Sequence, residues 1–143
     1  MLSKITIGIT QALNAEFGDE VKIYIDDIEQ GLEEPCFLVT PLTSTENHLI
    51  GKRYERNYPF VIQYFPKSKN YRTECNEVTE QLLNVLELIT MDGDLIRGSD
   101  MTGHVEDGVL NFEVTYKMHV FKKRTSTDDE VMENMEQDIS VKE

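Results

Sequence analysis

The stretch DGVLNFEVTYKMHVF, residues 107–121, decides the fold because its side chains alternate without interruption. The apolar positions of this alternation are Leu110, Phe112, Val114, Tyr116, Met118 and Val120. A period of two over so many residues predicts a long strand with one face in the core. The Asp-Gly pair before it is a strong turn signal, and a similar turn stands at residues 92–94. These turns bracket two short strands, expected at residues 95–97 and 104–106.

Upstream of this region, four more strands are expected, at residues 21–25, 36–40, 53–58 and 60–65. The second is a nearly continuous apolar run, which fits a strand buried on both faces. Pro59 separates the last two, because proline donates no hydrogen bond to a sheet. The polar segment 43–51 ends in glycine, so we expect a mobile loop or the tip of a long hairpin there.

Two amphipathic helices complete the pattern. Residues 2–16 carry apolar side chains at helical spacing, and Gly18 is the expected stop. A second helix is expected over residues 74–89, with Thr73 as its N-cap. Its apolar stripe consists of Cys75, Val78, Leu82, Leu86 and Ile89. The order of helix, strands, helix and strands predicts an α+β fold, in which two helices pack on one face of a mainly antiparallel sheet.

The charge is the strongest compositional feature. The 143 residues include 27 acidic and 14 basic side chains, a net charge of −13. Such a surface repels nucleic acid, and the densest basic cluster, residues 121–124, is expected to be a solvated strand end. No apolar run approaches the roughly 18 residues of a membrane span, and the start lacks a secretory pattern. We therefore expect cytoplasmic synthesis, with Cys36 and Cys75 reduced and in the core.

The composition changes at residue 125. We expect one α+β domain over residues 1–124 and an acidic C-terminal tail over residues 125–143, which holds seven acidic residues and one lysine. A disordered tail is one interpretation. The other is a helix that orders on a neighbouring subunit, because Thr127 to Glu130 form a capping box. Its apolar face would consist of Met132, Met135 and Ile139.

The sequence holds no nucleophile elbow, phosphate loop, dinucleotide fingerprint or zinc-binding pair. His48, His104 and His119 also lack metal-ligand spacing, so we expect neither a cofactor nor an enzyme. The best catalytic alternative is a metal-dependent nuclease using the carboxylates of Asp92, Asp94, Asp100 and Glu106. Asp-Gly-Asp is also ordinary turn chemistry, and no obvious lysine stands beside these residues to activate a water.

Several strings are typical of one family: Glu29-Gln30-Gly31, Glu34-Pro35-Cys36-Phe37, Gly51-Lys52-Arg53-Tyr54-Glu55-Arg56, Pro59-Phe60, Gln63-Tyr64-Phe65, Glu74-Cys75-Asn76, Asp92-Gly93-Asp94-Leu95-Ile96-Arg97-Gly98 and Asp107-Gly108-Val109-Leu110. Over about residues 1–122, the chain resembles tail terminator proteins of tailed phages and of phage-derived contractile particles from Gram-positive hosts. These strings are turns and strand segments rather than catalytic motifs. They identify lineage better than mechanism.

The resemblance implies a structural protein that caps the head-proximal end of the tail tube, usually as a six-fold ring. It would stop tube polymerisation and present the head-joining surface. The implied partners are further copies of this chain, the tail tube protein, head–tail connector proteins and, in a contractile tail, the sheath protein. DNA would slide through an acidic lumen without being specifically bound. The protein would lie in the host cytoplasm during assembly and in the particle tail afterwards. A head–tail connector or tail-completion protein remains the alternative.

Contacts within such a ring join different patches of neighbouring subunits. Our candidates for subunit or tube contacts are Arg53, Tyr54, Arg56 and Arg97, because planar guanidinium groups and tyrosine suit interfaces. The tail residues Met132, Met135 and Ile139 are added for their expected apolar face. The alternative for the arginines is that they are exposed strand charges of little energetic value.

Overall fold

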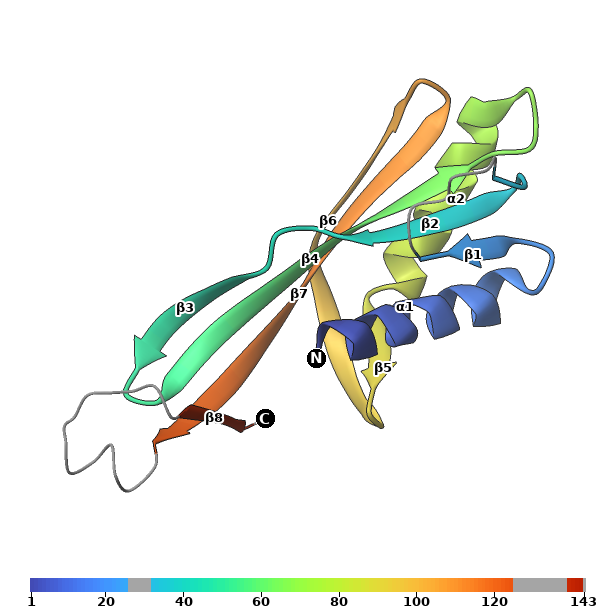
Figure 1. Ribbon diagram of the computed structural model, residues 1–143. Coiled ribbons are helices and arrows are strands. Elements are labelled where there is room, and N and C mark those ends of the chain that lie inside the picture. Colours follow the sequence, from blue (N-terminus) through green and yellow to red (C-terminus); the bar gives the residue numbers. More distant parts are fainter. Residues whose placement is uncertain (26–31, 125–138, 143) are drawn as a thin grey trace. The chain divides into compact units, whose positions relative to one another are not determined.

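The computed structural model describes residues 1–25, 32–124 and 139–142 (Figure 1). Its elements are, in order, α1 (Leu2–Phe17), β1 (Lys22–Tyr24), β2 (Cys36–Pro41), β3 (Thr45–Ile50), β4 (Arg53–Phe65), α2 (Tyr71–Val85), β5 (Leu88–Met91), β6 (Asp94–Glu106), β7 (Val109–Arg124) and β8 (Ile139–Lys142). Two helices with a mostly antiparallel sheet confirm the α+β prediction.

The chain divides into two units. The first, which we call the helical unit, comprises residues 1–43 and 58–116. The second, the ribbon unit, comprises residues 44–57 and those from 117 onward. Strands β4 and β7 contribute to both units. The domain boundary predicted at residue 125 coincides with the start of a segment outside the described residues, so that boundary stays a prediction.

Strand β7 lies in the middle of the sheet, whose order is β1-β2-β4-β7-β6-β5, with β3 paired to β4 and β8 paired to β7. β1 and β2 run parallel, whereas β2–β4, β5–β6 and β6–β7 are antiparallel. The Asp107-Gly108 turn joins β6 to β7 with φ angles of 53° and 75°. Positive φ at both turn residues matches the right-handed twist of a two-residue hairpin, which is why Asp-Gly suits this position.

The core of the helical unit forms between the sheet and its two helices. The alternation predicted for β7 is confirmed, because Leu110, Phe112, Val114 and Tyr116 of this unit are buried, and so is Val120 of the ribbon unit. The sixth position of this set, Met118, is half-buried. From α1, Ile5, Ile9 and Leu13 are fully buried, and Gly18 ends that helix at φ 78° as predicted. Cys36 and Cys75 are free and buried, which confirms their expected place in the core.

The boundaries of α2 differ from the prediction. The helix begins at Tyr71, so Thr73 lies inside its first turn and is not the N-cap. The Glu74 carboxylate instead organises the loop before the helix, where it accepts the backbone N–H groups of Lys67 and Ser68 at 3.0 and 2.9 Å. The helix ends at Val85, and Ile89 lies in β5 rather than on the helical stripe.

Of the two alternatives for segment 43–51, the hairpin is confirmed, because residues 45–50 form strand β3 and pair with β4. Two other strand predictions needed correction. Pro59 does not interrupt β4, because the partner strand changes there. Asn57 lies opposite Thr45, the first residue of β3, and Phe60 lies opposite Pro41, the last residue of β2. The pieces predicted at 95–97 and 104–106 belong to the single strand β6, whose register shifts between Ser99 and Thr102.

Candidate assembly surface

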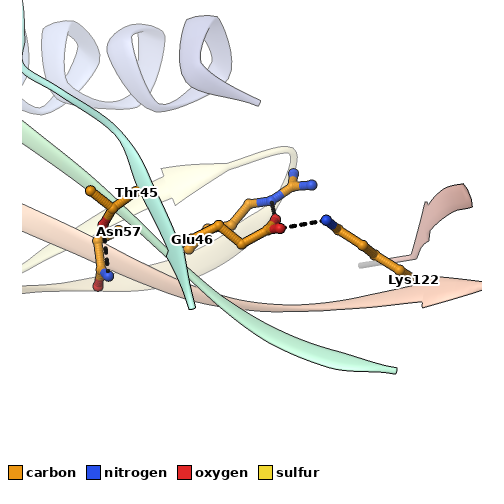
Figure 2. Close-up of polar contacts among 5 residues, drawn as sticks. Thr45, Glu46, Asn57 and Lys122 are labelled. Atoms are coloured by element: carbon orange, nitrogen blue, oxygen red, sulfur yellow. Dashed lines mark hydrogen bonds and ion pairs between the residues drawn. The ribbon is translucent and has the colours of Figure 1, made fainter. Parts of the chain in front are cut away.

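Strand β4 carries three of the predicted contact residues, Arg53, Tyr54 and Arg56, within the ribbon unit. Every residue of this unit's strand β3, Thr45–Ile50, is exposed. At the base of the β3–β4 hairpin, the Asn57 amide Nδ2 donates to the Thr45 hydroxyl Oγ1 at 3.1 Å (Figure 2). The strand is therefore held by its pairing with β4 and by side-chain contacts rather than by burial.

Glu46 links three strands of the ribbon unit. Its carboxylate accepts the Arg56 Nε–H at 2.7 Å and pairs with the Lys122 ammonium (Figure 2). The side chains of Glu46, Arg56 and Lys122 are only 31%, 21% and 19% exposed. The hydrogen bond from Lys122, followed by that from Arg56, holds the pKa of Glu46 below its ordinary value. Through these contacts, Glu46 on β3 links to Arg56 on β4 and to Lys122 on β7.

Tyr54 lies within the same network. The Lys122 ammonium stands 4.3 Å from the centre of the Tyr54 ring, and the His48 ring lies 4.7 Å from it. His48 in turn hydrogen-bonds through Nε2 to the Gly51 carbonyl at 2.7 Å. Lys122 is thus half-buried between Glu46 and an aromatic face, which differs from the solvated strand end expected for this cluster.

The structure distributes the predicted contact residues over both units. Arg56 and Tyr54 are bound within the ribbon unit, whereas the neighbouring Arg53 is exposed. Arg97 lies on β6 of the helical unit, where it pairs with Glu87 at 2.6 Å and keeps 65% of its side chain exposed. Ile139 begins β8, opposite Arg124 of β7. Met132 and Met135, like the rest of the predicted tail helix, lie outside the described residues.

Of the carboxylates considered for a nuclease, Asp92 adopts φ 53° in the turn between β5 and β6 and pairs with Lys4 at 2.6 Å. Asp100 has the same φ at the register shift of β6. Asp94 and Glu106 are the first and last residues of strand β6. Within residues 1–25, 32–124 and 139–142, no three His, Cys, Asp or Glu side chains gather as metal ligands.

Two segments of the ribbon unit form a basic patch within this acidic chain, a feature that the sequence analysis missed. Residues 44–57 and 117–124 hold seven Lys and Arg against two Glu, a formal charge of +5, whereas residues 125–143 of the same unit carry −6. The helical unit holds six basic and 18 acidic residues, a formal charge of −12. The basic residues come from two segments about sixty positions apart, so no single window of sequence contains them. Their combined charge becomes visible only once the pairing of β3, β4 and β7 is known.

Apolar side chains are also exposed on the ribbon unit. Ile50 is 72% exposed, Leu49 is 49% exposed and Phe121 is 43% exposed. Single exposed apolar residues are ordinary, but three within one small unit suggest a surface that contacts protein. Residues 44–57 and 117–124 of the ribbon unit therefore combine positive charge with apolar contact area.

Comparison with known proteins identifies the lineage. A family model described as phage tail terminator protein matches residues 4–128. The chain belongs to the phage tail terminator family. The resemblance found in the sequence is thereby confirmed, and the match covers nearly all residues that the structure describes. No curated protein matches the chain.

Membership of the terminator family gives the chain a structural role in the phage tail and contacts with other tail or head components. None of the described helices is long and apolar enough to cross a membrane.

Proposed function

We propose that this chain caps the head-proximal end of a phage or phage-like tail tube as a closed ring, a hexamer in the simplest case. The ring stops tube polymerisation and presents the surface to which the head joins. The observation that carries this proposal is the match to the tail terminator family over residues 4–128. Its partners are then the tube protein, the head–tail connector proteins and, in a contractile tail, the sheath protein.

A closed ring requires contacts between two different patches of each subunit. The two units of this chain supply patches of different composition, one basic with exposed apolar residues and one acidic. Arg53 and Arg97 are our candidates for direct contacts because both side chains are exposed. Tyr54 and Arg56 support such contacts indirectly, through the network around Glu46 that shapes the ribbon unit.

The passage of DNA is also compatible with the composition. Each subunit carries a net charge of −13, so a ring would present a predominantly negative surface to the phosphates. Like charges repel, and DNA would slide through the lumen without adhering. No sequence-specific DNA contact is part of the proposal.

The decisive experiment measures tail length by negative-stain electron microscopy in particles assembled with and without this protein. Overlong, headless tubes in its absence, restored to normal length by supplying the wild-type protein, would support the terminator function. Tubes of normal length that fail to join heads would favour a head–tail connector. Normal infectious particles would refute both structural functions.

A further inference from the structure

We propose that the ribbon unit of one subunit docks on the acidic helical unit of a second copy of this chain, and that this contact closes the ring. The inference deepens the proposed function and rests on it. The ribbon surface that docks is defined by Leu49, Ile50, Lys52, Arg53 and Phe121. The occupant of this surface is therefore another copy of the protein.

The first support is charge complementarity. Around the docking surface, residues 44–57 and 117–124 carry a formal charge of +5, and the helical unit carries −12. Opposite fields on two patches steer association and fix which patches meet. Two of these basic patches would repel each other, as would two helical units, so the pattern favours a head-to-tail contact over a two-fold one. Head-to-tail contacts are the kind that generate rings.

The second support is the state of the charged side chains on the ribbon. Lys52 and Arg53 follow the hairpin turn at Gly51 and are exposed. Lys52 stands 6.0 Å from the centre of the exposed Phe121 ring, so charge and apolar area adjoin each other. Lys122, in contrast, is occupied by Glu46 and Tyr54. The cations at the hairpin turn are therefore the ones best placed for an intermolecular contact.

The third support distinguishes a protein partner from DNA. Leu49, Ile50 and Phe121 expose apolar area that phosphates cannot use, whereas protein interfaces bury such area at their centre. The helical unit offers matching apolar surface, with Ile7, Leu88 and Leu95 between 43% and 67% exposed. Between α1 and β5 it also has a groove whose walls include Gly8 and Ala12. One partner thus supplies both negative charge and apolar contact area.

The contact would also explain how a ring containing basic strands leaves DNA free to move. Docked on a neighbour, the positive charges of each ribbon unit are neutralised by the acidic helical unit beside it. What remains for the lumen is the net negative charge of the whole chain. Exposed toward DNA, the same basic strands would bind phosphates and slow its passage.

The first test is a charge reversal, Lys52→Glu with Arg53→Glu. Native mass spectrometry and light scattering of the full chain at low salt would follow assembly against protein concentration. We expect the reversal to raise the concentration needed for assembly by at least about tenfold, and added salt to weaken wild-type assembly. Circular dichroism would show whether the variant keeps its fold.

The matched control reverses one lysine and one arginine of the helical unit, Lys69→Glu with Arg72→Glu, both exposed. It changes the net charge equally but makes the receiving surface more acidic, so assembly should stay unchanged or strengthen. Equal weakening by both variants would overturn the inference. So would a wild type that stays monomeric at low salt, while tail length would still report on the capping function separately.

A second test identifies the surface that the ribbon contacts. A photo-crosslinking amino acid replaces Ile50, and the chain is mixed with a copy labelled with ¹⁵N. Crosslinks to residues 1–25 or 58–116 of the differently labelled copy are expected. Crosslinks confined to other ribbon units would overturn the proposal. Binding of duplex DNA that the Lys52/Arg53 reversal abolishes while rings persist would overturn it too, because phosphates would then be the partner.

Discussion

Replacing Glu46 by glutamine should loosen the ribbon unit, because this carboxylate holds two cations from different strands. It accepts the Arg56 Nε–H at 2.7 Å and pairs with Lys122. Glutamine has nearly the same size but no charge, and its single amide oxygen can satisfy only one of the two donors well. The other cation is then left half-buried beside an amide.

The size of the effect follows from the exposure of the three side chains. Hydrogen bonds to charged groups contribute about 1.5–3 kcal/mol, whereas exposed ion pairs contribute about 0.2–1 kcal/mol. With 19% to 31% of each side chain exposed, the Glu46 network lies between these limits. Allowing for the bond that glutamine keeps, we expect a loss of about 1–2 kcal/mol in the free energy of unfolding.

Urea denaturation at pH 7 measures this loss, and hydrogen exchange locates it. We expect the urea midpoint to fall by about 0.5–1 M, and faster exchange in β3 and the first part of β4. Glu77→Gln, on the exposed side of α2, removes the same charge and should change stability by less than about 0.5 kcal/mol. Equal midpoints for the two variants would refute the reasoning.

The same network predicts a pH dependence. Because Lys122 and Arg56 lower the pKa of Glu46 in the folded state, the stabilisation is complete above the unfolded value of about 4.3. It is lost as pH falls through the folded pKa. The stability gap between wild type and Glu46→Gln should therefore narrow in acid. A gap of constant size from pH 7 to the acid limit of folding would mean that the ionised carboxylate is not its cause.

Three further predictions concern the helical unit. Tyr116→Phe removes a fully buried hydroxyl that donates to the Leu86 carbonyl at 2.8 Å, so thermal unfolding should show a loss of about 1–2 kcal/mol; an unchanged melting temperature would contradict this. Gly98→Ala would place a Cβ 2.7 Å from the same carbonyl and should cost about 1–3 kcal/mol in urea denaturation, a prediction that wild-type stability would refute. Burial raises the pKa of the Cys36 thiol to about 11 and raises that of Cys75, so a thiol reagent at pH 8 should label both only after unfolding; rapid labelling of the folded protein would contradict their burial.

The parts of the fold that the sequence predicted well depend on local chemistry. The alternation along β7 and the Asp-Gly turns need no distant partner to be recognised, and both were confirmed. The middle of β6 was missed because its residues are polar or glycine. A Cβ at Gly98 would lie 2.7 Å from the Leu86 carbonyl, and one at Gly103 would lie 3.2 Å from the Phe112 ring opposite it, so both positions favour a small residue. Those neighbours are distant in sequence, so their effect is invisible in a window of residues.

The end of α2 illustrates a second limit. Leu86 and Ile89 continue the helical spacing of the apolar stripe, and both are buried, yet the helix stops at Val85. After Leu86, the Glu87 carbonyl accepts the Gly98 backbone N–H at 2.7 Å, which starts the pairing of β5 with β6. Apolar periodicity reports burial, and burial alone does not distinguish the last turn of a helix from the first residues of a strand.

The candidate contact residues show the same dependence on long-range pairing. Tyr54 and Arg56 were chosen because their chemistry suits interfaces. Inside the subunit, however, Tyr54 contacts Lys122 and Arg56 donates to Glu46. Glu46 and Lys122 are separated by 76 positions, so their contact could not be inferred from spacing. Arg53 points to the opposite face of the strand from Arg56 and is exposed. Its intermolecular role stays a prediction.

The net charge of the chain was the most misleading of its simple properties. A value of −13 indicates a uniformly acidic protein that avoids phosphates, yet the pairing of β3, β4 and β7 brings together a basic patch from residues 44–57 and 117–124. If the proposed ring forms and DNA passes through it, a basic surface facing the DNA would bind phosphates and slow its passage unless it is covered. The acidic helical unit of a neighbouring copy is a cover that is present whenever a ring is. The separation of basic and acidic surfaces within the subunit would then both order the ring and keep its lumen negative. Reversing the charges of Lys52 and Arg53 should therefore weaken ring assembly and leave the remaining basic residues uncovered.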